Sequence, residues 1–323
     1  MSSQISNGLE KTRPKIGVAL SGASGRAIAH IGILEVLREN QIPVDYMVGC
    51  SSGALIAVSY ATGTMEQLKD LFYKLNLRSL LKLWSAKNSK GGLFHLHNAD
   101  DEIKKFTKGM NFEDVYPRLG FTATDLESGE LVTLSMGDMT KAFKASVAVP
   151  GLFEPVVWGN KILVDGGLAN IVPTIPTKEM GADIVIGVNL AADKFIYENK
   201  LPIWRGYRFI TRFLGLQYIR EKILTKFSSR IFFQFDSQSD LLEETDIKIP
   251  GVLTVLTKAL DHAMVISKQW QESDMACDLM LEPRVKHYGK INFKSLEKIY
   301  LEGRKTAKQA LPQIKKLIES YGE

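Results

Sequence analysis

The N-terminal part of this chain alternates twice between a short apolar run and a stretch with helical periodicity. Ile16–Leu20 and Val44–Val48 are runs of the kind that forms buried strands. Each leads through a small-residue turn into apolar residues at helical spacing, over Ile28–Leu37 and Ala54–Ala61. The order strand, helix, strand, helix favours a parallel sheet with right-handed crossovers. The chain is therefore predicted to adopt an α/β fold.

Further elements follow, with fewer strands toward the C-terminus. A hairpin is predicted around Glu127–Glu130, and two more strands are predicted at Lys161–Val164 and Ile184–Leu190. Beyond Leu190 the strand signal fades, and the chain is expected to end in a pair of charged helices. These helices are expected at about residues 293–305 and 308–321. The expected organisation is a flexible tail over residues 1–14, a core over residues 15–190 and a helical C-terminal extension over residues 191–323.

Composition narrows the class of protein. With 45% apolar and 24% charged residues, the 323-residue chain can bury a large core without disulfides or metal ions. Its two cysteines, Cys50 and Cys277, lie far apart and form no CxxC pattern, so neither a disulfide framework nor a zinc site is expected. Met1–Lys15 lacks the apolar segment of a signal peptide, and no apolar run approaches the length of a spanning helix. A cytoplasmic location is predicted.

Two segments combine basic and aromatic residues, within a net charge of +5. They are Leu71–Ala99, which contains Trp84, and Lys194–Arg230, which contains Trp204. Such residues often only coat a solvated helical face. The alternative is a lid that meets an anionic membrane peripherally, because cationic side chains attract head groups while tryptophans settle at the interface. No nucleic-acid-binding motif accompanies the charge, so no nucleic-acid partner is expected.

Gly49-Cys50-Ser51-Ser52-Gly53 has the G-x-S-x-G form of a nucleophile elbow and stands between a predicted strand and a predicted helix. A serine on so tight a turn adopts a strained backbone conformation, which requires small residues two positions before and two after it. Its hydroxyl then lies at a helix N-terminus, which favours a developing oxyanion. The alternative is a serine that only caps the helix.

The base that would activate Ser51 is predicted to be Asp165. In α/β-hydrolases the elbow follows several strands and a later histidine completes the triad, whereas here one strand precedes it. A buried aspartate can act as base where it reaches the serine hydroxyl directly. Asp165 follows the Lys161–Val164 run, at the strand end where open α/β sheets place their chemistry. An Asx-turn is the alternative role.

The loop Ser21–Arg26 is the candidate oxyanion site. A small-residue turn between a strand and a helix exposes successive backbone N–H groups, which bind phosphate or a tetrahedral oxyanion. The loop contains neither a P-loop motif nor a clean G-x-G-x-x-G, so a nucleotide is not expected.

Three separated motifs resemble the patatin-like phospholipase family, over roughly Lys15–Leu190. Leu20–Gly32 resembles the family's oxyanion loop and first helix, Val48–Ala54 resembles its nucleophile elbow, and Ala145–Pro155 with Val164–Leu168 resembles its dyad region. The resemblance implies a three-layer α/β/α sandwich with a mostly parallel central sheet and a helical C-terminal addition. Residues 15–190 would be the catalytic core.

The resemblance also implies the chemistry. It implies a serine acyl hydrolase of lipid degradation, in which Ser51 and Asp165 form a Ser-Asp dyad that cleaves phospholipid or lysophospholipid esters through an acyl-enzyme, without calcium, another metal or a cofactor. The oxyanion hole would be formed by backbone N–H groups of Gly22, Ala23, Ser24 and Gly25.

One departure from the family's pattern leaves alternatives open. The family's loop has three successive glycines and another after the basic residue, whereas this chain has Gly22, Ala23 and Ser24, and then Ala27 after Arg26. If these positions need positive φ, each substitution costs about 1 kcal/mol or more. The alternatives are a lipid acyltransferase that uses the same dyad, and a lipid-binding scaffold with little or no activity.

Overall fold

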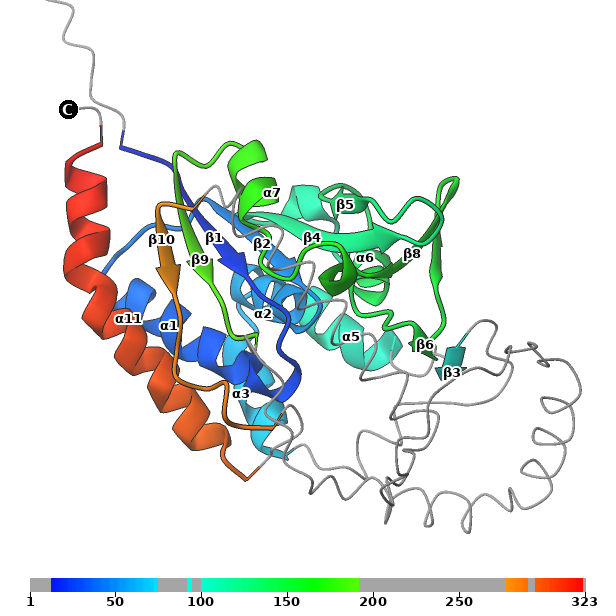
Figure 1. Ribbon diagram of the computed structural model, residues 1–323, viewed down its shortest axis with the longest axis horizontal. Helices are drawn as coiled ribbons and strands as arrows, with labels where there is room; N and C mark the ends of the chain where they lie inside the picture. The colour runs from blue at the N-terminus through cyan, green and yellow to red at the C-terminus, as the bar shows by residue number, and fades with distance from the viewer. Residues whose placement is uncertain (1–12, 75–91, 95–99, 192–276, 290–293, 322–323) are drawn as a thin grey trace, which may run out of the picture. The chain divides into compact units, whose positions relative to one another are not determined.

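In the computed structural model we describe residues 13–74, 92–94, 100–191, 277–289 and 294–321. Within them an eight-stranded sheet has the order β10-β9-β1-β2-β4-β8-β7, with β5 paired to β4 outside this path (Figure 1). Its strands are β1 (Ile16–Leu20), β2 (Tyr46–Cys50), β4 (Arg118–Asp125), β5 (Leu131–Leu134), β7 (Val156–Trp158), β8 (Lys161–Asp165), β9 (Ile184–Val188) and β10 (Leu279–Leu281). A separate parallel pair is formed by β3 (Gly92–Phe94) and β6 (Gly151–Phe153).

The helices connect and cover these strands. The α-helices are α1 (Ile28–Glu39), α2 (Ser52–Ala61), α3 (Met65–Lys74), α5 (Asp100–Thr107), α6 (Met139–Ser146), α7 (Thr174–Glu179) and α11 (Leu296–Glu319). Short 3-10 turns are η1 (Ser24–Ala27), η3 (Phe112–Asp114) and η4 (Gly166–Leu168).

The sheet is mostly parallel, as predicted. β10, β9, β1, β2 and β4 run parallel to one another, while β5 and β8 pair antiparallel with β4, and β7 pairs antiparallel with β8. β1 and β9 are buried along their whole length, which is typical of parallel strands covered on both faces. The α/β class predicted from the strand-helix alternation is therefore confirmed.

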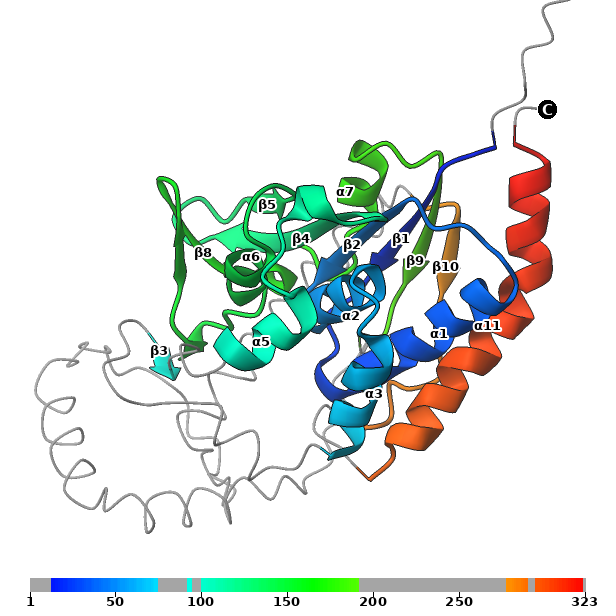
Figure 2. The same cartoon turned by 180° about the vertical axis from the view of Figure 1, so that it is seen from behind.

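Helices lie on both faces of the sheet. Gly17 in β1 and its partner Tyr46 in β2 face α7, where a β-carbon on Gly17 would meet Thr177. Gly49, three positions after Tyr46, faces the first turn of α2. Because side chains alternate along a strand, α2 and α7 cover opposite faces. The predicted three layers are present, and Figure 2 shows the side on which α1, α2 and α5 lie over the sheet.

The C-terminal part contributes more than helices. β10, which was not predicted, adds in parallel to β9 and extends the sheet, and it belongs to the same compact unit as the core strands. Of the predicted extension, residues 192–276 lie outside the described residues, so its role as a lid stays a prediction. Of the predicted flexible tail, residues 1–12 also lie outside them, while Arg13 forms a bidentate pair with Asp45.

The predicted pair of C-terminal helices is wrong, because α11 is one continuous helix with Pro312 inside it. Its buried residues form a single stripe that continues through the expected break: Leu296, Ile299, Tyr300, Gly303, Ala307 and Ile314. This stripe packs against α1 so closely that a β-carbon on Gly303 would collide with the carbonyl oxygen of Ala29. Packing therefore outweighs the backbone hydrogen bond that Pro312 removes.

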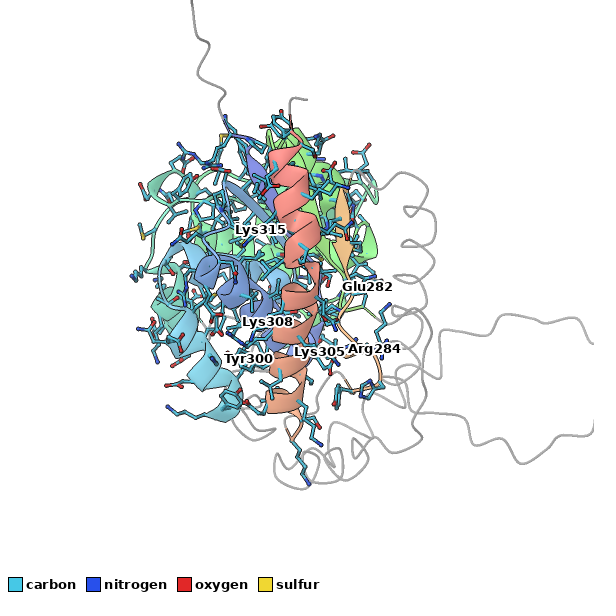
Figure 3. All side chains as sticks on the ribbon, turned by 90° about the vertical axis from the view of Figure 1, so that its left-hand side faces the viewer. Glu282, Arg284, Tyr300, Lys305, Lys308 and Lys315 are labelled. Atoms are coloured by element: carbon cyan, nitrogen blue, oxygen red, sulfur yellow. The ribbon has the colours of Figure 1, made fainter. Side chains whose placement is uncertain are left out.

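A buried carboxylate joins three helices. Glu35 of α1, which is 5% exposed, accepts hydrogen bonds from Lys69 of α3 and from Tyr300 and Arg304 of α11. Burial favours protonation of Glu35, but these three donors outweigh it and lower the pKa of the carboxyl. In Figure 3, Tyr300 lies on the α3 side of α11, whereas Lys305, Lys308 and Lys315 are exposed residues of the same helix.

None of the described helices has the length and apolarity needed to cross a bilayer.

Candidate active site

Ser51 occupies the sharp turn between β2 and α2. Its backbone has φ of 51° and ψ of −120°, a left-handed conformation that costs a non-glycine residue about 1–3 kcal/mol. A β-carbon on Gly49 would collide with the backbone of Ala54, and one on Gly53 would collide with the carbonyl of Leu20. Both glycines are therefore required by close backbone approach, which is the steric reason expected from the sequence.

Two buried residues, Ser146 and Cys50, lie next to Ser51. The backbone N–H of Ser51 donates to Oγ of Ser146, the last residue of α6, over 2.9 Å. Cys50 is fully buried, and burial raises the pKa of its thiol far above the usual range. Because only the thiolate is a strong nucleophile, Cys50 does not compete with Ser51 as the candidate nucleophile.

Asp165 reaches Ser51 through the registry of three adjacent strands. Cys50 of β2 pairs with Thr122 of β4, and Ala123, the next residue of β4, pairs with Asp165 of β8. Asp165 thus lies at the level of Ser51, on the opposite side of β4. The strand that carries it runs antiparallel to β4, contrary to the expectation of a site at parallel strand ends.

The two side chains meet in a short hydrogen bond. Oγ of Ser51 donates to Oδ2 of Asp165 over 2.7 Å, across 114 positions of sequence. The other carboxylate oxygen, Oδ1, accepts the backbone N–H of Gly167 over 2.8 Å. Asp165 is 2% exposed, and its backbone is held by Ala148 and Thr124. The carboxylate of Asp165 therefore accepts the Asx-turn hydrogen bond from Gly167 and also contacts Ser51, the candidate nucleophile.

The candidate oxyanion loop, Ser21–Arg26, approaches Ser51 at Gly22. A β-carbon on Gly22 would approach Cβ of Ser51 to 3.2 Å. The N–H groups of the first three loop residues are used within the protein. Ser21 donates to the carbonyl of Val188 over 3.1 Å, Gly22 to the carbonyl of Ile171 over 3.3 Å, and Ala23 to Oγ of Ser52 over 2.9 Å. Those of Ser24 and Gly25 have no acceptor among the described residues.

The two unpaired N–H groups open the helical run formed by η1 and α1. Ser24 is exposed and Gly25 is partly exposed, and they follow closely after Gly22, where an added β-carbon would come within 3.2 Å of Cβ of Ser51. The first N–H groups of a helix carry its positive dipole end and bind anions. The loop therefore offers two donors for a negatively charged oxygen.

Only one of the three residues that replace the family's glycines has a strained backbone. Ala23 has φ of −156° and Ala27 has φ of −56°, and side chains are tolerated at both values. Ser24 alone is left-handed, with φ of 52°. The expected cost of the altered loop is thus confined to one residue, about 1 kcal/mol.

His30 supports the loop from the protein interior. It is fully buried in α1, and its Nε2 lies 2.9 Å from the carbonyl oxygen of Ser21, to which it donates. Burial, opposed by this hydrogen bond, lowers the pKa of His30 to about 4. The neutral ring therefore tethers the start of the loop near neutral pH. Among the described residues no group of three or more His, Cys, Asp or Glu side chains is placed to hold a metal ion.

The sequence analysis missed two side chains that hold the site together. Ser146 lies within the Ala145–Pro155 run but carried no sign that it would bond the backbone of Ser51. Ser52 stood inside the elbow motif as an unspecified position. The basic-aromatic segments are not described over residues 75–91, 95–99 and 194–230, so their membrane contact stays a prediction.

The chain is similar in sequence to known proteins. Residues 18–178 match the family described as patatin-like phospholipase. An uncharacterized NTE family protein of Mycobacterium tuberculosis is 28% identical over 55% of this chain and 49% of its own length. Lysophospholipase NTE1 of Coccidioides immitis is 25% identical over 93% of this chain but only 18% of its own length. The chain thus spans about half or less of these curated relatives.

A solved structure also resembles the chain. VipD from Legionella pneumophila matches with a TM-score of 0.46 and 12% identity, covering 94% of this chain and 67% of that one.

Proposed function

This chain belongs to the patatin-like phospholipase family, and from that premise we propose that it is a serine acyl hydrolase acting on ester bonds of phospholipids or lysophospholipids. The observation that carries the proposal is the 2.7 Å hydrogen bond from Oγ of Ser51 to Oδ2 of Asp165. The bond joins the hydroxyl of Ser51, a partly exposed residue with a strained backbone, to the buried carboxylate of Asp165, and this arrangement fits a nucleophile and its base.

The first half-reaction follows from this geometry. Ser51 attacks the acyl carbonyl while Asp165 takes the hydroxyl proton, and the carbonyl oxygen becomes an oxyanion. The N–H groups of Ser24 and Gly25 donate to that oxygen, which stabilises the negative charge as it forms. The tetrahedral intermediate collapses as Asp165 returns the proton to the leaving alcohol. Ser51 is then left acylated.

The second half-reaction regenerates the enzyme. Asp165 accepts a proton from water, the water oxygen attacks the acyl carbonyl, and the same N–H groups bind the new oxyanion. Collapse releases the fatty acid and returns the proton to Ser51. Every step uses side chains and backbone groups of the chain itself, and the hydrogen bond from Gly167 keeps Oδ1 occupied while Oδ2 exchanges protons.

The substrate class rests on the relatives. One relative is named a lysophospholipase, and its match covers 93% of this chain and 18% of the relative. A phospholipid or lysophospholipid is accordingly the proposed substrate, and contact with an anionic membrane surface would bring the enzyme to it.

The test compares wild type with Ser51→Ala and Asp165→Asn in fluorophosphonate labelling and in release of fatty acid from lysophosphatidylcholine. Ser128→Ala and Asp101→Asn, at exposed positions, serve as matched controls. Labelling should vanish in Ser51→Ala, and turnover in Asp165→Asn should fall at least about 100-fold. Absence of labelling in folded wild-type protein would contradict the proposal and favour a lipid-binding scaffold.

A further inference from the structure

The hydroxyl of Ser52 connects two segments that the chemistry needs to keep together. Its Oγ accepts the backbone N–H of Ala23 over 2.9 Å, across 29 positions of sequence. Ser52 is the first residue of α2 and directly follows Ser51, while Ala23 directly precedes the two unpaired N–H groups. A single hydrogen bond therefore spans from the nucleophile's helix to the oxyanion loop.

Two other anchors of the loop involve segments outside the elbow. Oγ of Ser21 accepts the N–H of Leu190 over 2.9 Å, and Gly22 donates to Ile171 over 3.3 Å. These bonds fix the start of the loop to the chain around the end of β9 and before α7. The bond from Ala23 to Ser52 joins the loop to the first turn of α2, one position beyond Ser51, while the backbone of Gly22 also forms a hydrogen bond with Cys50, one position before Ser51.

The position of Ala23 makes this bond important for geometry. Ser24 adopts the left-handed φ of 52°, which turns the chain so that its own N–H and that of Gly25 lead into the helix. Ala23 is 6% exposed, and its N–H, bonded to Ser52, is the last backbone donor with an acceptor before that turn. If it is released, a left-handed serine is free to relax toward more favourable backbone angles, and the following N–H groups move with it.

The hydroxyl of Ser52 is directed away from its own helix. Ser51 is the N-cap residue of α2 and Ser52 is the first helical residue, and Oγ of Ser52 accepts the N–H of Ala23 in the other segment. Its contribution is thus to the relative placement of loop and elbow.

We propose that Ser52 is a positioning residue that sets the distance between Oγ of Ser51 and the N–H groups of Ser24 and Gly25. The inference rests on the proposed acyl-hydrolase function and deepens it. In this proposal a side-chain anchor from Ser52 fixes a loop that has fewer glycines than the family's pattern.

The experiment compares Ser52→Ala, Ser52→Thr and Ser52→Val with Ser59→Ala in hydrolysis of a p-nitrophenyl ester. Thr and Val have nearly the same shape, so they differ in the hydroxyl alone and keep the comparison valid if Ser52→Ala folds poorly. Ser59 is the matched control, because it is a buried serine of the same helix whose hydroxyl has no hydrogen-bond partner.

Loss of the hydroxyl should lower kcat about 10- to 100-fold with KM changed less than about 3-fold, because the displaced donors act on the transition state. Ser52→Thr should recover most of the activity, and Ser59→Ala should resemble wild type. A trifluoromethyl ketone, which forms a tetrahedral oxyanion on Ser51, should bind the Ala and Val variants more weakly by about the factor lost in kcat/KM.

The possible failures are distinguishable. If wild type is labelled by fluorophosphonate but Ser52→Val matches Ser52→Thr in kcat and in ketone affinity, the role of Ser52 is refuted and the hydrolase stands. If all Ser52 variants lose thermal stability and labelling in proportion, Ser52 is only structural, which also refutes the inference. If folded wild type is not labelled, the proposed function and the inference fall together.

Discussion

Ser146 at the end of α6 accepts the backbone N–H of Ser51, so one serine holds the strained conformation of another. Ser146→Ala would leave a partly buried N–H without its partner, which costs about 1–3 kcal/mol. We expect a lower midpoint of thermal unfolding and a reduced kcat, with less loss of activity than in Ser51→Ala. Differential scanning calorimetry and ester hydrolysis measure both. Unchanged stability and rate in Ser146→Ala would show that the bond is dispensable.

The close contact of α11 with α1 predicts an unusual sign for a glycine substitution. Gly→Ala inside a helix ordinarily stabilises by about 1 kcal/mol. At Gly303 the new β-carbon would collide with the backbone of Ala29, so Gly303→Ala should instead destabilise by about 1–3 kcal/mol. Urea unfolding gives the free energy, with exposed Gln309→Ala on the same helix as control. A stabilised Gly303→Ala would mean that the helices do not touch there.

The carboxylates that share Arg304 offer a matched pair. Glu35 is buried and also accepts from Lys69, whereas Glu39, whose side chain is 49% exposed, pairs with Arg304 at the surface. Glu35→Ala removes the buried acceptor of Lys69 and Tyr300, while Arg304 keeps its pair with Glu39, so it should cost clearly more than Glu39→Ala, which should cost less than about 1 kcal/mol. Equal losses in chemical denaturation would show that burial does not separate the two interactions.

Asp45 predicts a dependence of stability on acid. Hydrogen bonds from Arg13, opposed by burial and aided by Tyr116 and Ile16, lower the pKa of Asp45 to about 2. A lowered folded-state pKa stabilises the protein above the unfolded value of about 4, and this contribution is lost as the pH falls from about 4 to about 2. The difference in unfolding temperature between wild type and Asp45→Asn should therefore shrink over that range. A difference that is independent of pH would exclude the titration of Asp45 as its source.

Local motifs in the sequence were enough to indicate the elbow, the aspartate and the small-residue loop. Gly49 and Gly53 mark the turn because their surroundings leave no room for a β-carbon, and this constraint is visible in residue type alone. The direction of β8 was not visible, because a short apolar strand has the same pattern whether it pairs parallel or antiparallel.

Interactions between distant segments were also beyond the sequence. Which acceptor meets the N–H of Ser51 or of Ala23 depends on the packing of α6 and α2, and no spacing in the chain encodes it. β10 has only three residues, too few for a periodic pattern, and it forms because β9 offers it an edge. The continuity of α11 was hidden for a similar reason, since its contact with α1 decides it.

The strand β4 lies between β2, which leads into Ser51, and β8, which ends at Asp165, and its pairing with both strands determines how far apart the two residues lie. The chain between them is free to gain or lose residues in its loops, because pairing with β4, and not the length of the chain, sets their separation. A slip of β8 by a single residue is another matter. Since neighbouring side chains in a strand point to opposite faces, it would carry the carboxylate of Asp165 away from the hydroxyl of Ser51 and break the hydrogen bond between them.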